Sequence, residues 1–253
     1  MFHTALFHAS LAGNAALTQL NALGDDVLAP SGNGYYVPQK FPFLLRAVGV
    51  GNLLMRAQLN AGSLREPGPF DISPVNVGTG ILMPPRVQDF RYNPIALTPR
   101  EELDCSILNS AAGPTRTSVA VWLSDGPVRP ATGKIITLRY TNAATAAVAF
   151  TWTSWQPVMD NALPAGTYAL VGSRLQSTTQ LFHRYIPRIA EAGRPGFLSG
   201  QADGDNQDYM DRFGAMGEVM RFTHDTIPQV QVFCLAADAA ATQIGYMDVI
   251  KVG

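Results

Sequence analysis

Similar short strings recur in the two halves of this 253-residue chain, in the same order and at a nearly constant offset. A spacing this long, repeated along the whole chain, is typical of a duplicated domain rather than of one continuous core. We therefore predict two related units at 1–128 and 133–253, joined by a linker at 129–132 that lies within the Pro- and Gly-containing stretch 126–133. At offsets of 126 to 129 residues, the matches are Asn52–Ala57 with Gln180–Tyr185 (Arg56 over Arg184), Pro67-Gly68 with Pro195-Gly196, Pro99 with Pro228, Cys105 with Cys234 and Val37-Pro38 with Leu163-Pro164.

Most segments between the Gly, Pro, Asn and Asp residues have the pattern of short strands. Lys134–Tyr140, Val148–Trp155 and Gln229–Leu235 are rich in β-branched and aromatic residues. Residues 53, 55, 57 and 59 are all apolar, which predicts a strand with one buried face there. The chain is predicted to be all-β.

Two segments favour short helices. Apolar residues recur at spacings of three and four between Asp205 and Met220, and Thr98-Pro99-Arg100-Glu101 has a hydroxyl cap, a proline at the first helical position and an acid in the first turn. A strand that begins at Leu103 competes with the second helix. About 125 residues of short strands with one such excursion have the size and punctuation of an eight-stranded jelly roll. We therefore expect two tandem jelly rolls, each with a short helix in its second half.

The composition limits the classes of function. Hydrophobic residues make up 47% of the chain and charged residues only 15%, so general disorder is excluded. A formal net charge of −1, with the first basic residue at Lys40, argues against a polybasic arm or sequence-specific binding to nucleic acid. Sparse charge on a folded chain suggests that much of its surface contacts other protein. We expect neither a signal peptide nor a membrane-spanning segment.

No pattern of catalytic, cofactor-binding or metal-ligating residues emerges from the sequence. A cupin-type metal site needs a His-x-His pair, which is absent, so the histidines are expected to be scattered over surfaces or interfaces. The Gly-x-Ser-x-Gly elbow of hydrolases is also absent, and the glycines that follow an apolar run lack the third glycine of a dinucleotide-binding loop. We predict no enzyme activity and no cofactor. The residues weighed were His3, His8, His183 and His224, the pairs Gly62-Ser63 and Gly172-Ser173, and Gly49-Val-Gly51.

Two further clusters each allow a functional and a structural interpretation. The acids and amides of 203–208 could bind Ca²⁺, but they depart from calcium-loop spacing and suit the first turn of a helix better. Phe150, Trp152 and Trp155 could form a sugar-binding platform, although their alternation is more typical of a core strand. Cys105 and Cys234 are expected to remain free, buried thiols, because equivalent positions in neighbouring units lie too far apart for a disulfide.

With its paired segments around Arg56 and Arg184 and around Cys105 and Cys234, the chain resembles the double jelly-roll major capsid proteins of tailless icosahedral viruses. The resemblance implies a virion protein that forms pseudo-hexameric homotrimers, which tile into a shell with minor or vertex proteins and, as often in that family, over an internal membrane. The segment Phe2–Leu28 could face that membrane, but its apolar residues are better explained as the core side of the first strand.

Two other classes of function stay open: a carbohydrate-binding β-sandwich protein and a two-domain jelly-roll hydrolase. The hydrolase would need paired acids, and glutamates are few. They are Glu66, Glu101, Glu102, Glu191 and Glu218.

Overall fold

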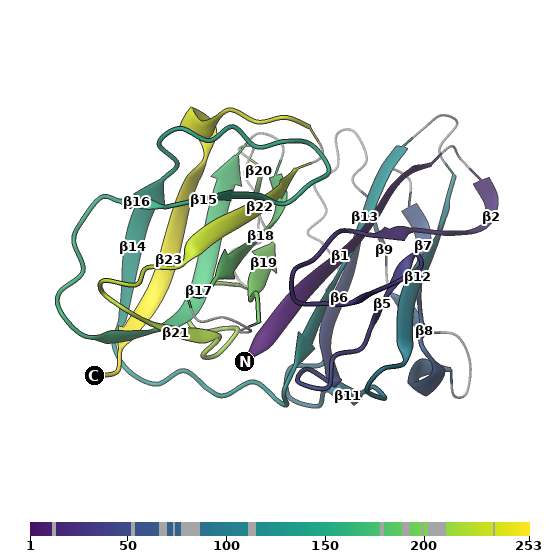
Figure 1. The fold of residues 1–253 in the computed structure, drawn as a ribbon, viewed down its shortest axis with the longest axis horizontal. Coiled ribbons are helices and arrows are strands. Elements are labelled where there is room, and N and C mark those ends of the chain that lie inside the picture. The colour runs from purple at the N-terminus through teal and green to yellow at the C-terminus, as the bar shows by residue number, and fades with distance from the viewer. Residues whose placement is uncertain are drawn as a thin grey trace. The chain divides into compact units, whose positions relative to one another are not determined.

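The computed structural model of the chain is all-β: strands make up 55% of it and helix is almost absent (Figure 1). The antiparallel sheets are consistent with the β-sandwich class, as the strand patterns in the sequence predicted. The structure describes residues 1–11, 14–51, 54–65, 70–72, 74–76, 87–110, 115–177, 180–188, 193–198, 200–201, 211–234 and 236–253.

The chain divides into two compact units, Phe2–Pro127 and Val128–Gly253, called here the N-terminal and C-terminal units. The division lies beside the predicted linker at 129–132. Residues of that segment contact the C-terminal unit: the Arg129 carbonyl accepts a hydrogen bond of 3.0 Å from the Glu218 amide, and Ala131 packs against the buried side chains of Ala169, Val171 and Ile250.

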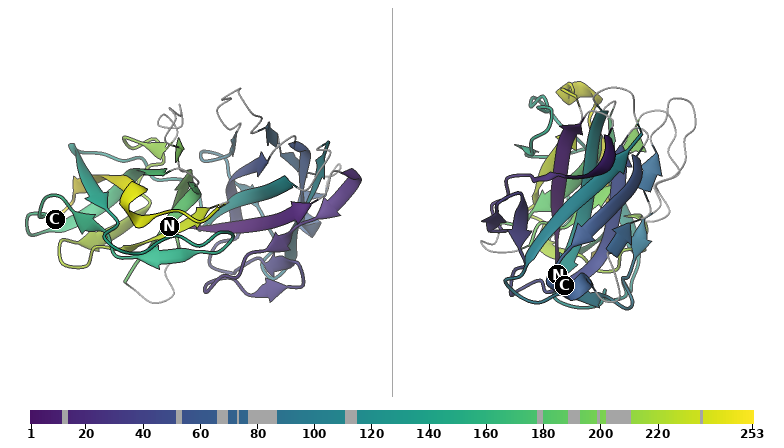
Figure 2. Two further views of the ribbon diagram at one scale, coloured as in Figure 1. Left: turned by 90° about the horizontal axis from the view of Figure 1, so that it is seen from above. Right: turned by 90° about the vertical axis from the view of Figure 1, so that its right-hand side faces the viewer.

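The N-terminal unit consists of two sheets. In one sheet the strands run in the order β10-β6-β13-β1-β3, with β9 and β11 also paired to β6; in the other they run β4-β5-β12-β7-β8, with β2 paired to β12. Figure 2 shows β1 (purple) beside β13 (teal) from two further directions, in agreement with their ladder from Phe2↔Ser124 to Leu11↔Thr115. The elements are β1 (Phe2–Leu11), β2 (Asn14–Gln19), β3 (Asn21–Ala22), β4 (Pro30–Ser31), β5 (Gly34–Tyr36), β6 (Phe43–Gly51), β7 (Leu54–Asn60), η1 (Gly62–Leu64), β8 (Phe70–Ile72), β9 (Pro74–Asn76), β10 (Gln88–Asp89), β11 (Ile95–Ala96), β12 (Glu102–Asn109) and β13 (Thr115–Ser124).

Apolar side chains from both sheets form the core of the N-terminal unit. Phe7 of β1 and Val121 of β13 pack in one cluster with Leu59 of β7 and with Leu103 and Cys105 of β12. These side chains alternate along their strands with residues that point the other way, as expected for a sheet with one face turned to a core. Both cysteines of the chain, Cys105 and Cys234, are free and buried, which confirms the prediction for them.

The C-terminal unit also consists of two sheets. One has the order β16-β14-β23-β17-β20, with β21 paired to β17, and the other has the order β15-β22-β18-β19. The predicted strands at 134–140 and 229–235 correspond to β14 and β22. The elements are β14 (Ile135–Thr141), β15 (Thr153–Trp155), β16 (Val158–Met159), β17 (Thr167–Ser177), β18 (Gln180–Ile186), β19 (Gly196–Leu198), β20 (Gly200–Gln201), β21 (Met220–Thr223), β22 (Gln229–Cys234), η2 (Ala240–Thr242) and β23 (Ile244–Lys251).

The two predicted helices are not found in the described residues. At 98–101 the chain makes a turn in which Glu101 N–H bonds to the Thr98 carbonyl and Arg100 has φ +70°, and β12 then begins at Glu102, so the competing strand prevails. Of the predicted helix at 205–220, residues 205–210 lie outside the described residues. The described remainder of this segment contains a turn, with φ of +54° at Phe213 and +83° at Gly214. These positive φ values are incompatible with a right-handed helix.

The strand registers do not support the residue pairs that suggested the repeat. Arg56 of β7 lies opposite Leu108, whereas Arg184 of β18 lies opposite Gln231. If Arg56 matched Arg184 and Cys105 matched Cys234, the two ladders would differ in register by six residues, so these two matches cannot both describe equivalent positions. With an offset of 126 residues, the first and last residues of β7 coincide with the first and last residues of β18.

The predicted alternation at 53–59 is interrupted within β7. Ala57 and Leu59 are buried as expected, but Met55 is 59% exposed and Leu54 is 3% exposed. The ladder explains this difference, because Leu108 pairs with Arg56 while Asn109 pairs with Leu54, which leaves Met55 as the extra residue of a β-bulge. The bulge shifts the side-chain phase by one residue, so that Leu54 points inward instead.

Candidate functional site

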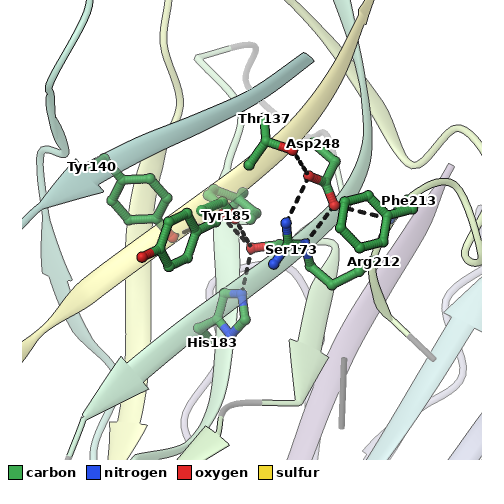
Figure 3. Close-up of polar contacts among 9 residues, drawn as sticks. Thr137, Tyr140, Ser173, His183, Tyr185, Arg212, Phe213 and Asp248 are labelled. Carbon is green, nitrogen blue, oxygen red and sulfur yellow. Dashed lines mark hydrogen bonds and ion pairs between the residues drawn. The ribbon is translucent and has the colours of Figure 1, made fainter. Parts of the chain in front are cut away.

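The feature most unlike an ordinary apolar core is a buried polar cluster in the C-terminal unit (Figure 3). It comprises Ser173 of β17, His183 and Tyr185 of β18 and Tyr140 of β14, all between 0% and 1% exposed. Because β14 and β17 belong to one sheet and β18 to the other, the cluster joins the two sheets of the unit.

Ser173 lies at the centre of this cluster. Its hydroxyl oxygen is 2.7 Å from His183 Nε2 and 2.6 Å from the Tyr185 hydroxyl, and it donates a hydrogen bond of 3.1 Å to the Tyr246 carbonyl. The Tyr185 hydroxyl is also 2.8 Å from that of Tyr140. Each hydroxyl therefore has partners, as buried polar groups require.

The Tyr140 ring reaches the cluster because its paired residue on the neighbouring strand β23 is a glycine, which has no side chain at the point of contact. Tyr140 pairs with Gly245 of β23, and a Cβ added to Gly245 would clash with the Tyr140 ring. Glycine is therefore required at 245 by the close approach of the aromatic ring. The Tyr140 ring lies against Trp155, with 5.9 Å between ring centroids.

Burial sets the protonation states in the cluster. Desolvation lowers the pKa of His183 to about 3, so the imidazole is neutral at neutral pH. Burial also raises the pKa of the Tyr140 and Tyr185 hydroxyls well above the ordinary value, which keeps both phenols protonated. The cluster is thus an uncharged hydrogen-bonded network.

A buried ion pair lies next to this network. The Asp248 carboxylate of β23 accepts hydrogen bonds from Arg212 Nε at 2.6 Å and Arg212 Nη2 at 3.1 Å. It also accepts hydrogen bonds from the Phe213 amide at 2.9 Å and the Thr137 hydroxyl at 2.7 Å. Asp248 is 0% and Arg212 8% exposed. Met247 pairs with Ser173 and Asp248 with Gly172, so Asp248 points to the opposite face of the sheet from Ser173.

A serine bonded to a neutral histidine is also the first half of a hydrolytic triad. Here, however, the Asp248 carboxylate binds Arg212 on the other face of the sheet, and Ser173 is only 1% exposed. A substrate carbonyl has no access to the Ser173 hydroxyl in this conformation. The arrangement can hold two sheets together and keep a proton off His183.

The residues weighed in the sequence are dispersed over both units. His3 and His183 are buried inside their units, in contrast to the expected surface or interface positions, while His224 is exposed. Trp155 is buried in the core and Trp152 lies 4.1 Å from the Arg184 guanidinium, so they do not form one exposed aromatic platform. The acid cluster at 203–208 lies outside the described residues.

Within the described part of the chain there is neither a cluster of metal-ligating residues nor a helix that could span a membrane. No group of three or more His, Cys, Asp and Glu there is placed to hold a metal ion. None of the helices described is long and apolar enough to cross a membrane.

Sequence analysis missed the buried network, although two signals for it exist. His183 and Tyr185 occupy alternate positions of the apolar segment Gln180–Ile186, which places them on one face of a strand. Asp248 interrupts the apolar run Gly245–Ile250, and a buried carboxylate needs a partner. Neither signal identifies that partner, because Ser173 and Arg212 come from other elements.

Comparisons with known proteins identify no relative: no family model, curated protein or solved structure matches the chain.

Proposed function

We propose that each unit is an eight-stranded jelly roll. Such a fold can be regarded as a long hairpin of eight strands that rolls up, so that the first strand pairs with the last, the second with the seventh, the third with the sixth and the fourth with the fifth. In the N-terminal unit these nested pairs are β1 with β13, β2 with β12, β6 with β10 and β11, and β7 with β8.

The same nesting recurs in the C-terminal unit and supports a tandem duplication. There the pairs are β14 with β23, β15 with β22, β17 with β21 and β18 with β19. The hairpin of the third and fourth strands also has the same spacing in both units: β6 ends at Gly51 and β7 begins at Leu54, while β17 ends at Ser177 and β18 begins at Gln180. Repeated nested pairing is the single observation that carries the proposal.

From this duplication we infer a structural role as the major capsid protein of an icosahedral virus. Three copies of a chain with two similar units present six similar edges, so a symmetric trimer can occupy positions with sixfold surroundings. The low content of charged residues, 15%, fits a protein whose lateral surfaces are covered by neighbouring copies. Its partners would be further copies, minor or vertex proteins and, in some shells, an internal membrane; no enzyme activity is proposed.

The mass of the purified chain in solution tests this proposal. Light scattering after size exclusion, over a dilution series in the micromolar range, should give three times the 27.2 kDa of one chain. Negative-stain images of the same fractions should show six-lobed particles, and more concentrated samples should form shells or sheets. A monomer throughout the series, with no ordered particles, would overturn the proposal.

A further inference from the structure

Each sheet has an outer face, the side that points away from the core of its own unit, and these faces differ between the units. In the N-terminal unit, the sheet of β1, β13 and β6 is buried on its outer face too. Thr4 pairs with Trp122, and Trp122 pairs with Arg46, so the three side chains form one row across this face. All three are fully buried, although the core cluster lies on the other side of the sheet. The outer face of this sheet therefore has the burial of a packed surface.

The corresponding sheet of the C-terminal unit, formed by β14, β23 and β17, has a more open outer face. Arg139 is exposed there and pairs with Tyr246, which is half-buried. Val158 of β16, at the margin of the same face, is 49% exposed. Phe213 lies beside Asp248 on this side of the sheet, as Figure 3 shows, and is 62% exposed. We call this surface the Phe213 face.

The backbone of Phe213 holds its ring toward solvent. A φ of +54° is rare for an aromatic residue, and such a conformation persists only where neighbouring groups fix it. Here the Phe213 amide donates a hydrogen bond of 2.9 Å to the Asp248 carboxylate, and the ring lies 4.5 Å from the Arg212 guanidinium. Exposed aromatic rings beside arginines are typical of protein interfaces.

The second sheets of the two units show the opposite distribution. In the C-terminal unit, Phe182 and Arg184 lie on the outer face of β18 and are buried. In the N-terminal unit, the outer face of β5, β12 and β7 carries two exposed side chains: Tyr36, which pairs with Glu102, and Met55, the extra residue of the β-bulge. We call this surface the Met55 face. Among the described residues, each unit thus has one buried and one open outer face, and the open faces belong to different sheets.

We propose that the Phe213 face of one copy binds the Met55 face of a second copy. This inference rests on the proposed function, because it names the contact through which three copies join. The two faces differ, so the contact is head-to-tail: each copy offers its Phe213 face to one neighbour and its Met55 face to the other. Contacts of this kind close into a ring when the rotation between copies allows it, and a ring of three copies is a cyclic trimer.

The charges of the described residues suit this pairing. Arg139 and Arg174 flank the same residue of β23 on the Phe213 face, and Asp160 binds Arg139 at its edge. Glu102 and Asp104 lie on the Met55 face, two residues apart on β12. A surface with arginines attracts a surface with carboxylates, whereas two copies of either surface repel each other. The head-to-tail contact is therefore favoured over a symmetric contact between like faces.

Hydroxyl-radical footprinting of the unmodified chain tests the contact directly. The side chains of Met55 and Phe213 should be oxidised more slowly in the trimer than in the monomer obtained by dilution. Tyr92, an exposed side chain in the turn after β10, is the internal reference and should react at the same rate in both. A trimer in which Met55 and Phe213 react as fast as in the monomer would overturn the proposal.

One substitution on each face measures the contribution of that face. Phe213→Asn removes the ring but keeps a residue type that tolerates positive φ, and Met55→Glu adds a carboxylate to a face that already carries acids. Each should raise the concentration at which the trimer dissociates by about tenfold or more. Val148→Asn and Tyr92→Glu, at exposed residues outside both faces, are the matched controls and should leave that concentration unchanged. If only one of the two face variants dissociates more readily, the faces are not partners and the proposal is wrong.

The proposed function and the proposed contact fail in different ways. An unmodified chain that is a monomer at every concentration overturns the capsid role, and the contact with it. A trimer that neither protects the two faces nor depends on them leaves the capsid role in place and refutes only the contact.

Discussion

The two units pair their main strands in the same nested order but fill the space between their sheets differently. The N-terminal interior is lined by apolar side chains from both sheets, such as Phe7, Leu59 and Val121. In the C-terminal unit, hydroxyls and an imidazole meet across the interior, with Ser173 bonded to both His183 and Tyr185. The same strand arrangement thus allows two ways of joining the sheets, apolar packing and hydrogen bonds. The first is weakened by loss of side-chain volume and the second by loss of a hydrogen-bond partner.

The largest expected difference is in the free energy of unfolding that is lost when one ion pair is removed from each unit. Arg212→Ala leaves the Asp248 carboxylate buried without its cation, and we expect it to lower the free energy of unfolding of the C-terminal unit by about 3–5 kcal/mol. The N-terminal pair of Arg56 with Asp71 is 38% and 49% exposed, so Arg56→Ala should cost only about 0–1 kcal/mol. Urea unfolding of both variants measures these changes, and equal costs would contradict the contrast.

A second pair of variants compares the two interiors directly. Leu103→Ala opens a cavity in the apolar core and should cost about 2–5 kcal/mol. Tyr185→Phe removes one hydroxyl that bonds Ser173 and Tyr140, and should cost about 1–3 kcal/mol because those two groups lose a partner. Tyr36→Phe, at a tyrosine that is 46% exposed, is the control and should be nearly neutral in the same denaturation assay. If Tyr185→Phe is also neutral, the hydroxyl network does not join the sheets.

The smallest expected effect tests backbone strain in one turn of each unit. Arg100 has φ +70° and is exposed, so Arg100→Gly should raise the free energy of unfolding by about 0.5–1 kcal/mol. Phe213, at φ +54°, should gain less from the same change, because its ring lies 4.5 Å from the Arg212 guanidinium and this contact is lost. Thermal melting measures both. Arg65→Gly, at a residue with φ −85°, should destabilise and serves as the control.

The sequence predicts the class of fold well because strands are recognisable from the residue pattern of short segments. The alternation and β-branched content of 134–140 and 229–235 coincide with β14 and β22. Alternation fails at Met55 because a bulge shifts the phase, and a bulge depends on the register with β12 rather than on β7 alone. The turn at Thr98 has helix-like capping residues, but Glu101 uses its carboxylate to bind the amides of Thr98 and Ser63, and the chain continues as strand.

The partners within the polar network could not be predicted from the sequence, because they too depend on which strands meet on folding. Ser173 and His183 are ten residues apart on consecutive strands, but Asp248 and Arg212 are joined only through folding across 36 residues. The matches at Arg56 and Cys105 are short local similarities, and they do not agree with the positions of the strands. β7 ends at Asn60 and β18 at Ile186, which are 126 residues apart rather than 128.

Pairing of the first strand with the last has a consequence for synthesis on the ribosome. β1 remains without its ladder partner until β13 has left the exit tunnel, more than a hundred residues later, and β14 must wait in the same way for β23 at the end of the chain. During this interval the apolar strand β1, which begins at Phe2, can pair with the β13 of a second nascent chain translated from the same mRNA. Rapid translation and a low density of ribosomes would therefore favour correct closure over strand exchange between copies.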